Sequence, residues 1–253
     1  MEHMFGFAKP DQALFTANWP APKNVKTLIS TRNGGVSKGE FASLNVGTHV
    51  GDAPQSVAEN RRRVQAHVPV PLVYLNQIHS ATVVAAEAHQ DALTDADASV
   101  AHDASVACAV MTADCLPVLF CNRQGTVVGA AHAGWRGLAG DVLAETVAKM
   151  GCDPLDVLAY LGPAIGPEAF EVGQDVWDAF CVPHPHAVTA FEDIGNDKYL
   201  ANMYDLAKVK LKDIGVTQIY GGDYCTVLQR DLFFSYRRDG QTGRMVSAIW
   251  LQD

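Results

Sequence analysis

The chain has 253 residues, of which 48% are hydrophobic and 19% are charged, a composition typical of a soluble globular protein with a substantial core. Its formal net charge of -9 at pH 7 argues against nucleic acid as a partner, because no basic stripe is present to displace phosphate counterions. No apolar run approaches the length that a membrane-spanning helix needs, so no membrane partner is expected.

Predicted strands and helices follow one another in irregular order. Apolar periodicity and turn residues predict, in chain order, a strand at 25–30, a helix at 54–67, strands at 73–75, 82–85, 106–111, 118–120 and 126–131, a helix at 138–150, a strand at 157–161, helices at 175–180 and 202–214, and a strand at 245–250. Asp52 is the predicted N-cap of the first helix, and the turn Asn122-Arg123-Gln124-Gly125 predicts a hairpin. Because the strands come in runs, we expect the α+β (mixed α/β) class, in one domain over residues 1–253.

The cysteines and the first residues bear on the cellular compartment. The six cysteines are scattered without Cys-x-x-Cys spacing, which fits a reducing compartment better than a disulfide framework. Residues 1–10 contain no basic segment followed by an apolar one, so a signal peptide is not expected. We therefore expect a cytoplasmic protein.

Three segments each place one metal-binding side chain at the end of a strand-like apolar run. They are Asn76-Gln77-Ile78-His79, Thr112-Ala113-Asp114-Cys115-Leu116-Pro117 and Ala131-His132-Ala133-Gly134-Trp135-Arg136-Gly137. One cysteine and two histidines can form a three-ligand zinc site with an open fourth position, which is the catalytic arrangement. Their spacing matches no short metal motif, and each residue has a simpler interpretation, namely a buried cysteine, a satisfied sheet histidine and an exposed loop histidine.

The neighbours of Cys115 favour a site over a plain core. Asp114 is a charged residue placed against an apolar strand, where it needs a partner. Pro117 cannot donate to a strand ladder, so regular pairing starts or stops near the cysteine. Asp114 is therefore a candidate for orienting a ligand or moving a proton.

Arginines form a second group of candidates. Arg32 precedes a double-glycine turn, Arg61 lies on the first predicted helix, and Arg136 lies in the turn that opens the second. A guanidinium can clamp a phosphate or a carboxylate, and free N–H groups at a helix start also attract anions. Most surface arginines are merely solvated, and this interpretation stays open for each. Among the remaining histidines only His49 is set apart, by the Asn-Val-Gly segment before it.

Five motifs, taken together and in order, resemble one bacterial family. They are Ser30-Thr31-Arg32-Asn33-Gly34-Gly35-Val36-Ser37, Ser43-Leu44-Asn45-Val46-Gly47, Thr112-Ala113-Asp114-Cys115, His132-Ala133-Gly134-Trp135-Arg136-Gly137 and Phe234-Ser235-Tyr236-Arg237-Arg238. The group is the laccase-domain, or multicopper polyphenol oxidoreductase, family, whose members are now described as purine nucleoside phosphorylases. The resemblance spans about residues 25 to 250.

This resemblance implies a fold, a metal and an activity. The fold is a single four-layer α/β/β/α sandwich domain, and the metal is zinc held by His79, Cys115 and His132, with copper as the alternative ion. The family's activities are phosphorolysis of adenosine, inosine and methylthioadenosine, and deamination of adenosine. The expected partners are thus a purine nucleoside and phosphate, and the expected state is a monomer. The candidate substrate-binding residues are Arg32, Asn45, Arg61 and Arg136.

Three other hypotheses stay open. Cys115 and His132 can serve as nucleophile and base of a metal-free hydrolase acting on an amide or a peptidoglycan precursor. The cleft can also serve binding alone. A copper polyphenol oxidase is disfavoured, because four coppers need many histidines, often as His-x-His, whereas the nine histidines here include one such pair, His184-Pro185-His186.

Overall fold

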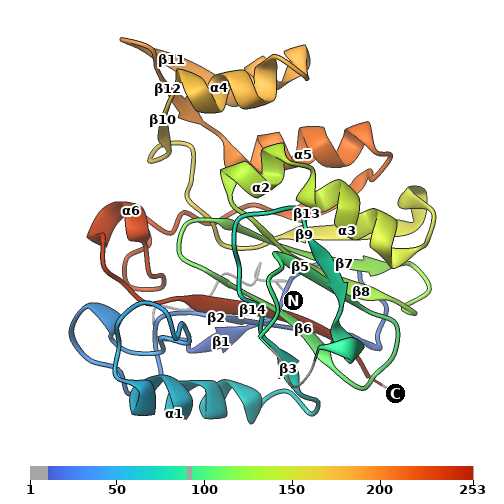
Figure 1. The fold of residues 1–253 in the computed structure, drawn as a ribbon, viewed down its shortest axis with the longest axis vertical. Helices are drawn as coiled ribbons and strands as arrows, with labels where there is room; N and C mark the ends of the chain where they lie inside the picture. Colours follow the sequence, from blue (N-terminus) through green and yellow to red (C-terminus); the bar gives the residue numbers. More distant parts are fainter. Residues whose placement is uncertain (1–10, 90–92, 253) are drawn as a thin grey trace, which may run out of the picture.

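Two large β-sheets packed on each other form the centre of the molecule (Figure 1). The computed structural model describes residues 11–89 and 93–252. The first ten residues, on which the expectation about a signal peptide rests, lie outside this part. No helix in the described part of the chain has the length and apolar character needed to cross a lipid bilayer.

The five-stranded sheet joins the two ends of the chain. Its strands, in spatial order, are β1 (Leu14–Phe15), β2 (Val25–Ser30), β14 (Met245–Leu251), β6 (Ala107–Thr112) and β3 (Leu72–Val73). Neighbours are antiparallel except for the parallel pair β3 and β6. The last strand of the chain thus lies between the second and the sixth, which fixes the C-terminal segment in the sheet.

The six-stranded sheet carries two of the three candidate metal ligands. Its strands, in spatial order, are β13 (Gln218–Gly221), β9 (Val157–Leu161), β7 (Leu116–Asn122), β8 (Val128–Ala133), β5 (Ala98–Ala101) and β4 (Val83–Ala85). The outer pairs β13–β9 and β4–β5 are parallel, and the inner pairs are antiparallel. The predicted hairpin at Asn122 to Gly125 is confirmed as the turn between β7 and β8.

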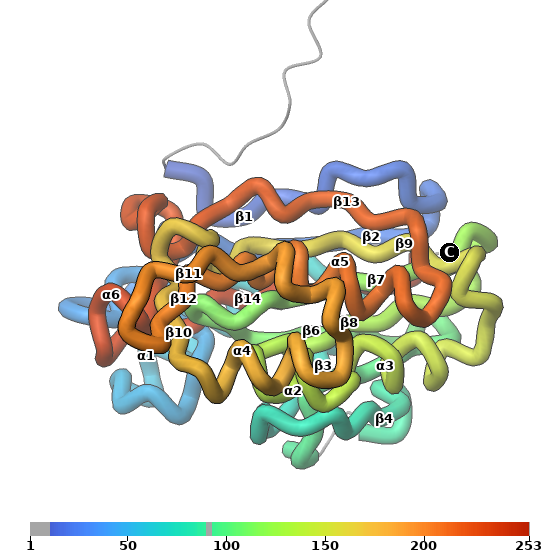
Figure 2. The backbone as a smooth tube through the Cα atoms, turned by 90° about the horizontal axis from the view of Figure 1, so that it is seen from above, coloured from blue at the N-terminus to red at the C-terminus, as the bar shows by residue number. Residues whose placement is uncertain are grey.

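Helices cover the outer faces of these sheets. The helices are α1 (Pro54–Gln65), α2 (Trp135–Ala139), α3 (Val142–Met150), α4 (Gln174–Cys181), α5 (Met203–Asp213) and α6 (Tyr236–Asp239), with short 3-10 turns at Gly39–Phe41, Ala86–Ala88, Pro154–Asp156 and Pro185–Ala190. Helix α1 lies below the five-stranded sheet in Figure 1, and α2, α3 and α5 lie above the six-stranded one. Figure 2, seen from above, shows α4 and a third sheet in front of the large sheets. That sheet contains β10 (Glu171–Gly173), β12 (Lys198–Ala201) and β11 (Phe191–Gly195).

Alternation along the strands explains why the central ones are buried throughout. In β7, Leu119 packs into the apolar cluster between the two sheets, while Val118 and Phe120 pack into the cluster under α3 and α5. Successive side chains of a strand point to opposite faces, so a strand covered on both sides reads as a continuous apolar run. Burial of each large side chain contributes roughly 1.5–3 kcal/mol. The rigid strand ends that carry the candidate site rest on this packing.

The predicted mixed α/β class is confirmed, and two local predictions are wrong. The helix expected over 138–150 is two helices, because the chain turns at Gly140 and Asp141, where Asp141 has a left-handed φ of 69°. Asp52 is not the N-cap of α1: Ala53 occupies that position. The Asp52 carboxylate instead accepts hydrogen bonds from Ser37 and Asn45.

Several elements were not predicted. Strand β5 consists of Ala, Ser and Val and gives a weak apolar signal. Strand β11 is largely exposed and β12 is mostly half-buried, so their side chains carry no clear core pattern. The third sheet and helix α6 belong to the same group. Of the elements that were not predicted, α6 and β5 lie nearest the candidate site. Asp114 is bonded to the backbone of Arg237 in α6, and His79 is bonded to Asp97, directly before β5.

Candidate metal centre

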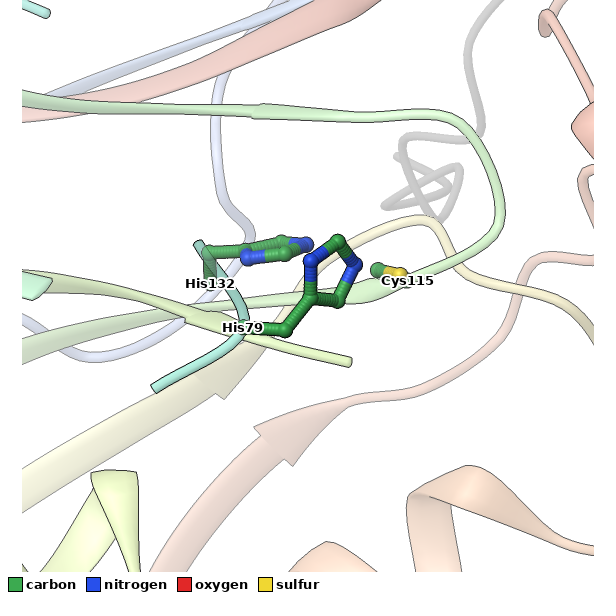
Figure 3. Close-up of side chains that lie close together, drawn as sticks. All are labelled: His79, Cys115 and His132. Atoms are coloured by element: carbon green, nitrogen blue, oxygen red, sulfur yellow. The ribbon is translucent and has the colours of Figure 1, made fainter. Parts of the chain in front are cut away.

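The three predicted ligands converge from separate segments (Figure 3). One ligand atom each of His79, Cys115 and His132 lies within 4.8 Å of the other two. Among the described residues no other three His, Cys, Asp or Glu side chains meet this condition. Cys115 directly precedes β7 and His132 lies in β8, and the antiparallel register that sets Leu116 opposite Ala133 brings both to one end of the hairpin.

Backbone geometry lets the side chains approach so closely. His79, in the segment between β3 and β4, has a left-handed φ of 61°, and Asp114, next to Cys115, has a φ of 88°. Such values are uncommon for residues other than glycine and mark positions that surrounding contacts hold in place. A Cβ atom on Gly134 would lie 3.0 Å from both Cys115 Sγ and His79 Cδ2. The absence of a side chain at Gly134 therefore provides space for the Cys115 and His79 side chains.

A buried carboxylate that the sequence analysis missed orients both histidines. Asp97 is fully buried, and its Oδ1 accepts from the His132 Nδ1–H at 2.8 Å and from the His79 backbone N–H at 3.0 Å. Its Oδ2 accepts from the backbone N–H and the hydroxyl of Ser80 at 2.6 and 2.9 Å. Because His132 bonds to Asp97 through Nδ1, Nε2 is the ring nitrogen left to bind a metal once its proton is displaced, an arrangement typical of metal-binding histidines. The signal was present, since Asp97 opens an apolar run as Asp114 does.

Asp114 is hydrogen-bonded to two segments that carry no candidate metal ligand. Its Oδ1 accepts from the Thr226 hydroxyl at 2.5 Å and its Oδ2 accepts from the Arg237 backbone N–H at 2.6 Å. These bonds tie the segments around Thr226 and the start of α6 to the loop that carries Cys115. The sequence suggested an orienting role for Asp114. In the structure the ring of His132 is hydrogen-bonded to Asp97 and not to Asp114.

The electrostatics of the pair favour a thiolate beside an imidazolium. Burial raises the pKa of Cys115, but the charge of His132 and hydrogen bonds from His132 and His79 outweigh it and lower the pKa to about 6. Burial lowers the pKa of His132, but the thiolate and the bonded Asp97 raise it to about 9. Two imidazoles and a thiolate with a carboxylate behind them form a donor set that suits zinc, and soft copper as well.

A small cavity of about 140 Å³ lies beside Cys115. It is lined by Ala113, Asp114, Cys115, Trp135, Ile165, Phe170, Met203, Tyr236 and Arg237. Most of these side chains are apolar or aromatic, as is usual for pockets that bind small organic ligands. Trp135 and Tyr236 come from the first positions of α2 and α6, so two short helices meet at the cavity.

The four predicted substrate-binding residues have different surroundings. Arg136 is exposed and its guanidinium lies 4.3 Å from the ring centroid of Trp135, next to the cavity. Arg61 is half-buried and stacks on Tyr74 at 4.0 Å. Arg32 donates to the backbone carbonyls of Ala42 and Arg230. It lines a different cavity from the one beside Cys115.

Asn45 is fully buried and its side chain is already occupied. Its Oδ1 accepts from the backbone N–H groups of Gly47 and Arg244, and its Nδ2 donates to the Gly47 carbonyl and to Asp52. An amide can form about four hydrogen bonds, so none is left for a ligand. The structure thus brings the three candidate metal ligands together, leaves Arg136 on Trp135 at the rim of the cavity, and uses Asn45 to fix a loop. Arg244, beside this loop, is a further residue that the sequence analysis missed.

We expect Asp97→Asn to weaken zinc binding about 10- to 100-fold while the fold persists, because the neutral amide no longer polarises and orients His132. Competition against a chromophoric chelator measures the affinity. Asp103→Asn, an exposed carboxylate change that leaves the site intact, is the control. Equal zinc affinity of the Asp97 variant and the native protein would contradict the orienting role.

Zinc binding should release about one proton per ion between about pH 7.5 and 8.5. In this window Cys115 is already a thiolate, whereas His132 still holds the proton that the metal displaces. Affinity should therefore rise with pH until about 9, where His132 is neutral before the ion arrives. Calorimetry in buffers of different ionisation enthalpy counts the proton. Binding that releases none throughout this window would refute the thiolate–imidazolium state.

Comparison with known proteins identifies the family of the chain. Residues 26–252 match the family described as multi-copper polyphenol oxidoreductase laccase. Purine nucleoside phosphorylase YfiH of Escherichia coli strain K12 is 52% identical over 240 residues, 94% of this chain and 98% of that protein. Purine nucleoside phosphorylase PA4543 of Pseudomonas aeruginosa is 49% identical over 242 residues, 95% of this chain and 99% of that protein.

Solved structures extend the likeness to the fold. Neisseria meningitidis protein NMB0706 is similar with a TM-score of 0.95 and 63% identity, covering 96% of this chain and all of that one. YlmD from Geobacillus stearothermophilus is similar with a TM-score of 0.91 and 32% identity, covering 98% of this chain and 99% of that one. With the match over nearly its whole length, the chain belongs to the multi-copper polyphenol oxidoreductase laccase family.

Proposed function

We propose that the protein is a zinc-dependent purine nucleoside phosphorylase that also deaminates adenosine. The observation that carries this proposal is the His79, Cys115 and His132 group beside an apolar cavity of about 140 Å³. The names of the Escherichia coli and Pseudomonas aeruginosa relatives support the phosphorylase activity. In this proposal the protein acts as a monomer in the cytoplasm, a reducing compartment in which its six free cysteines stay reduced.

The cavity supplies the recognition of the base. A purine is a flat aromatic ring system, and the rings of Trp135, Phe170 and Tyr236 give it apolar surfaces to pack against. Adenosine, inosine and methylthioadenosine share this ring system, so one cavity serves all three substrates. Phosphorolysis requires the ribose to lie toward Cys115, and deamination requires the C6 edge of the base to lie there, so the two reactions use different orientations of the nucleoside.

The reaction needs an anion held in line with the ribose. An oxygen of hydrogen phosphate bonds to the ribose C1′ while the bond from C1′ to the purine nitrogen breaks. The base leaves with the electron pair, and the phosphate proton ends on the base, which gives free purine and ribose 1-phosphate. Arg136 beside the cavity and Arg61 are the proposed residues that position phosphate, because positioning is most of what such a transfer needs. When bound, zinc supplies Lewis acidity and lowers the pKa of water, which deamination at the purine C6 requires.

Multi-copper oxidation finds little support in the ligand set. The described residues hold one three-ligand group, whereas a four-copper oxidase needs several. The His-x-His pair is engaged elsewhere: His184 and His186 both contact the carboxylate of Asp213, at 3.0 and 3.2 Å. Copper as the single bound ion in place of zinc remains compatible with the thiolate and the imidazoles.

A metal-free cysteine hydrolase is the second candidate function. The observation that favours it is the chain of contacts from Cys115 to His132 to Asp97, which matches a nucleophile, a base and an orienting carboxylate. Its substrate would be an amide, such as that of a peptidoglycan precursor. His79 separates the two candidates, because a metal needs this third ligand and a cysteine–histidine pair does not.

The test measures phosphorolysis of inosine by purified, zinc-loaded protein. The release of hypoxanthine and ribose 1-phosphate gives the rate. We expect Cys115→Ala and His79→Ala each to lower kcat/KM by about 100-fold or more, because either change removes a metal ligand. Cys152→Ala, a thiol outside the group, should leave the rate unchanged. Metal analysis identifies the ion in each sample.

Two outcomes would reject the proposal. Undiminished inosine phosphorolysis by Cys115→Ala would show that the metal group is not the active site. Hydrolysis of an amide substrate that survives chelation and His79→Ala, but not Cys115→Ala, would assign the chain to the cysteine hydrolases instead.

A further inference from the structure

Two half-buried arginines approach the same loop from different elements. Arg61 of α1 donates its Nε–H to the Val46 carbonyl at 2.8 Å. Arg244, directly before β14, donates its backbone N–H to Asn45 at 2.9 Å. Its side chain packs so tightly on Gly47 that a Cβ atom there would lie 2.8 Å from Arg244 Cγ. Residues 45–47 therefore hold both guanidinium groups in fixed positions and lead directly to His49.

Neither guanidinium has a carboxylate as its partner. Arg61 contacts the Met111 sulfur at 3.6 Å and the Tyr74 ring. One guanidinium nitrogen of Arg244, Nη1, donates to the carbonyls of Thr242 and Gly243. The ion pairs in the described part of the chain include neither residue. A guanidinium carries five N–H donors, so each retains donors for a ligand.

The neighbouring arginines of α1 behave differently. Arg62 and Arg63 are exposed, and both bond to Glu59 at 2.8 to 2.9 Å. The chain thus pairs the solvated arginines of this helix and leaves the half-buried one unpaired. A partly desolvated cation without a counter-ion costs stability, and such a cost is retained where a ligand supplies the missing charge.

The two arginines lie beside the metal group. Met111, which Arg61 contacts, exchanges two 2.7 Å hydrogen bonds with the side chain of Gln77, two residues before His79. The guanidinium carbon of Arg244 lies 6.0 Å from the ring centroid of Tyr236, which lines the cavity beside Cys115. Burial lowers the pKa of Arg244, and the charges of Cys115 and Asp114 raise it.

His49 follows the same loop. Burial, followed by the charges of Arg244, Arg61 and His132, lowers the pKa of His49. The carboxylates of this region are bonded elsewhere, Asp52 to Ser37 and Asn45 and Asp114 to Thr226 and the backbone of Arg237. Among the described residues, neither carboxylate forms an ion pair with Arg61 or Arg244.

We propose that Arg61 and Arg244 form the subsite that binds phosphate, with Arg244 as the residue that holds the anion next to the metal group. This inference rests on the proposed function and deepens it, because it assigns the second substrate to Arg61 and Arg244, so that Arg244 takes the place given above to the exposed Arg136. Two guanidinium groups match the tetrahedral oxyanion of phosphate, to which they donate in pairs. The proposed ligand is free inorganic phosphate. The phosphate group of a nucleotide could make the same contacts, and the test distinguishes the two.

The first arm of the test measures binding of inorganic phosphate itself, by calorimetry, to the zinc-loaded full chain and its variants. We expect Arg244→Gln and Arg61→Gln each to weaken phosphate binding about 10- to 100-fold, the effect of losing a charge-assisted hydrogen bond. Arg62→Gln, next to Arg61 but paired with Glu59, is the matched control and should bind as the native protein does. Arg244→Lys keeps the charge without the planar fork and should recover part of the affinity.

The second arm measures the steady-state constants for inosine phosphorolysis. The KM for phosphate should rise about tenfold or more in the two glutamine variants, and the KM for inosine should change by less than about twofold. Zinc content and melting temperature equal to those of the native protein exclude a folding defect.

The outcomes separate this inference from the proposed function. Phosphate binding that both arginine substitutions leave unchanged overturns the subsite, whatever the enzyme activity. Arginine-dependent phosphate binding without any inosine phosphorolysis supports the subsite and rejects the proposed function. Binding of inosine 5′-monophosphate through Arg244, without binding of free phosphate, overturns the assignment to inorganic phosphate.

Discussion

The buried carboxylate of Asp97 is the interaction on which the candidate site depends. It accepts hydrogen bonds from the His132 ring, the Ser80 hydroxyl and the backbone N–H groups of Ile78, His79 and Ser80. A carboxylate removed from water without partners costs on the order of several kcal/mol, so this full set of donors is what makes its burial tolerable. The same set holds the loop of His79 and the ring of His132 in one fixed relation. One side chain therefore determines the position of two metal ligands.

The third ligand is placed by the hairpin and by local backbone conformation. Cys115 and His132 come together because β7 and β8 pair in register, and both strands are covered on their two faces by apolar clusters. The left-handed backbone at His79 and the absence of a side chain at Gly134 then allow three ligand atoms to meet. Strained conformations of this kind persist only where packing and hydrogen bonds hold them. The backbone N–H of His79, in the segment between β3 and β4, is held by its hydrogen bond to Asp97.

Chemically distinct surroundings meet at Cys115. An apolar cavity lined by Trp135 and Tyr236 suits a flat base, and the unpaired arginines Arg61 and Arg244 suit an oxyanion. The Cys115 thiolate, which its histidine neighbours stabilise, is a candidate metal ligand beside these two proposed recognition surfaces. This division agrees with a reaction between a nucleoside and phosphate better than with oxidation of phenols, which requires more than one copper centre.

The sequence by itself determined the elements with strong apolar patterns, because periodicity and turn residues act locally: the strand at Val25–Ser30 and the hairpin of β7 and β8 were predicted. It also singled out His79, Cys115 and His132, which the structure brings together as a candidate metal group. Only the tertiary structure decided the roles of the polar residues. Asp97 and Arg244 are bonded across distances of 35 and 199 residues along the chain, and Asn45 is consumed by such bonds rather than left for a ligand. The partner of a charged side chain is set by which segments the fold brings together, and no local pattern encodes that.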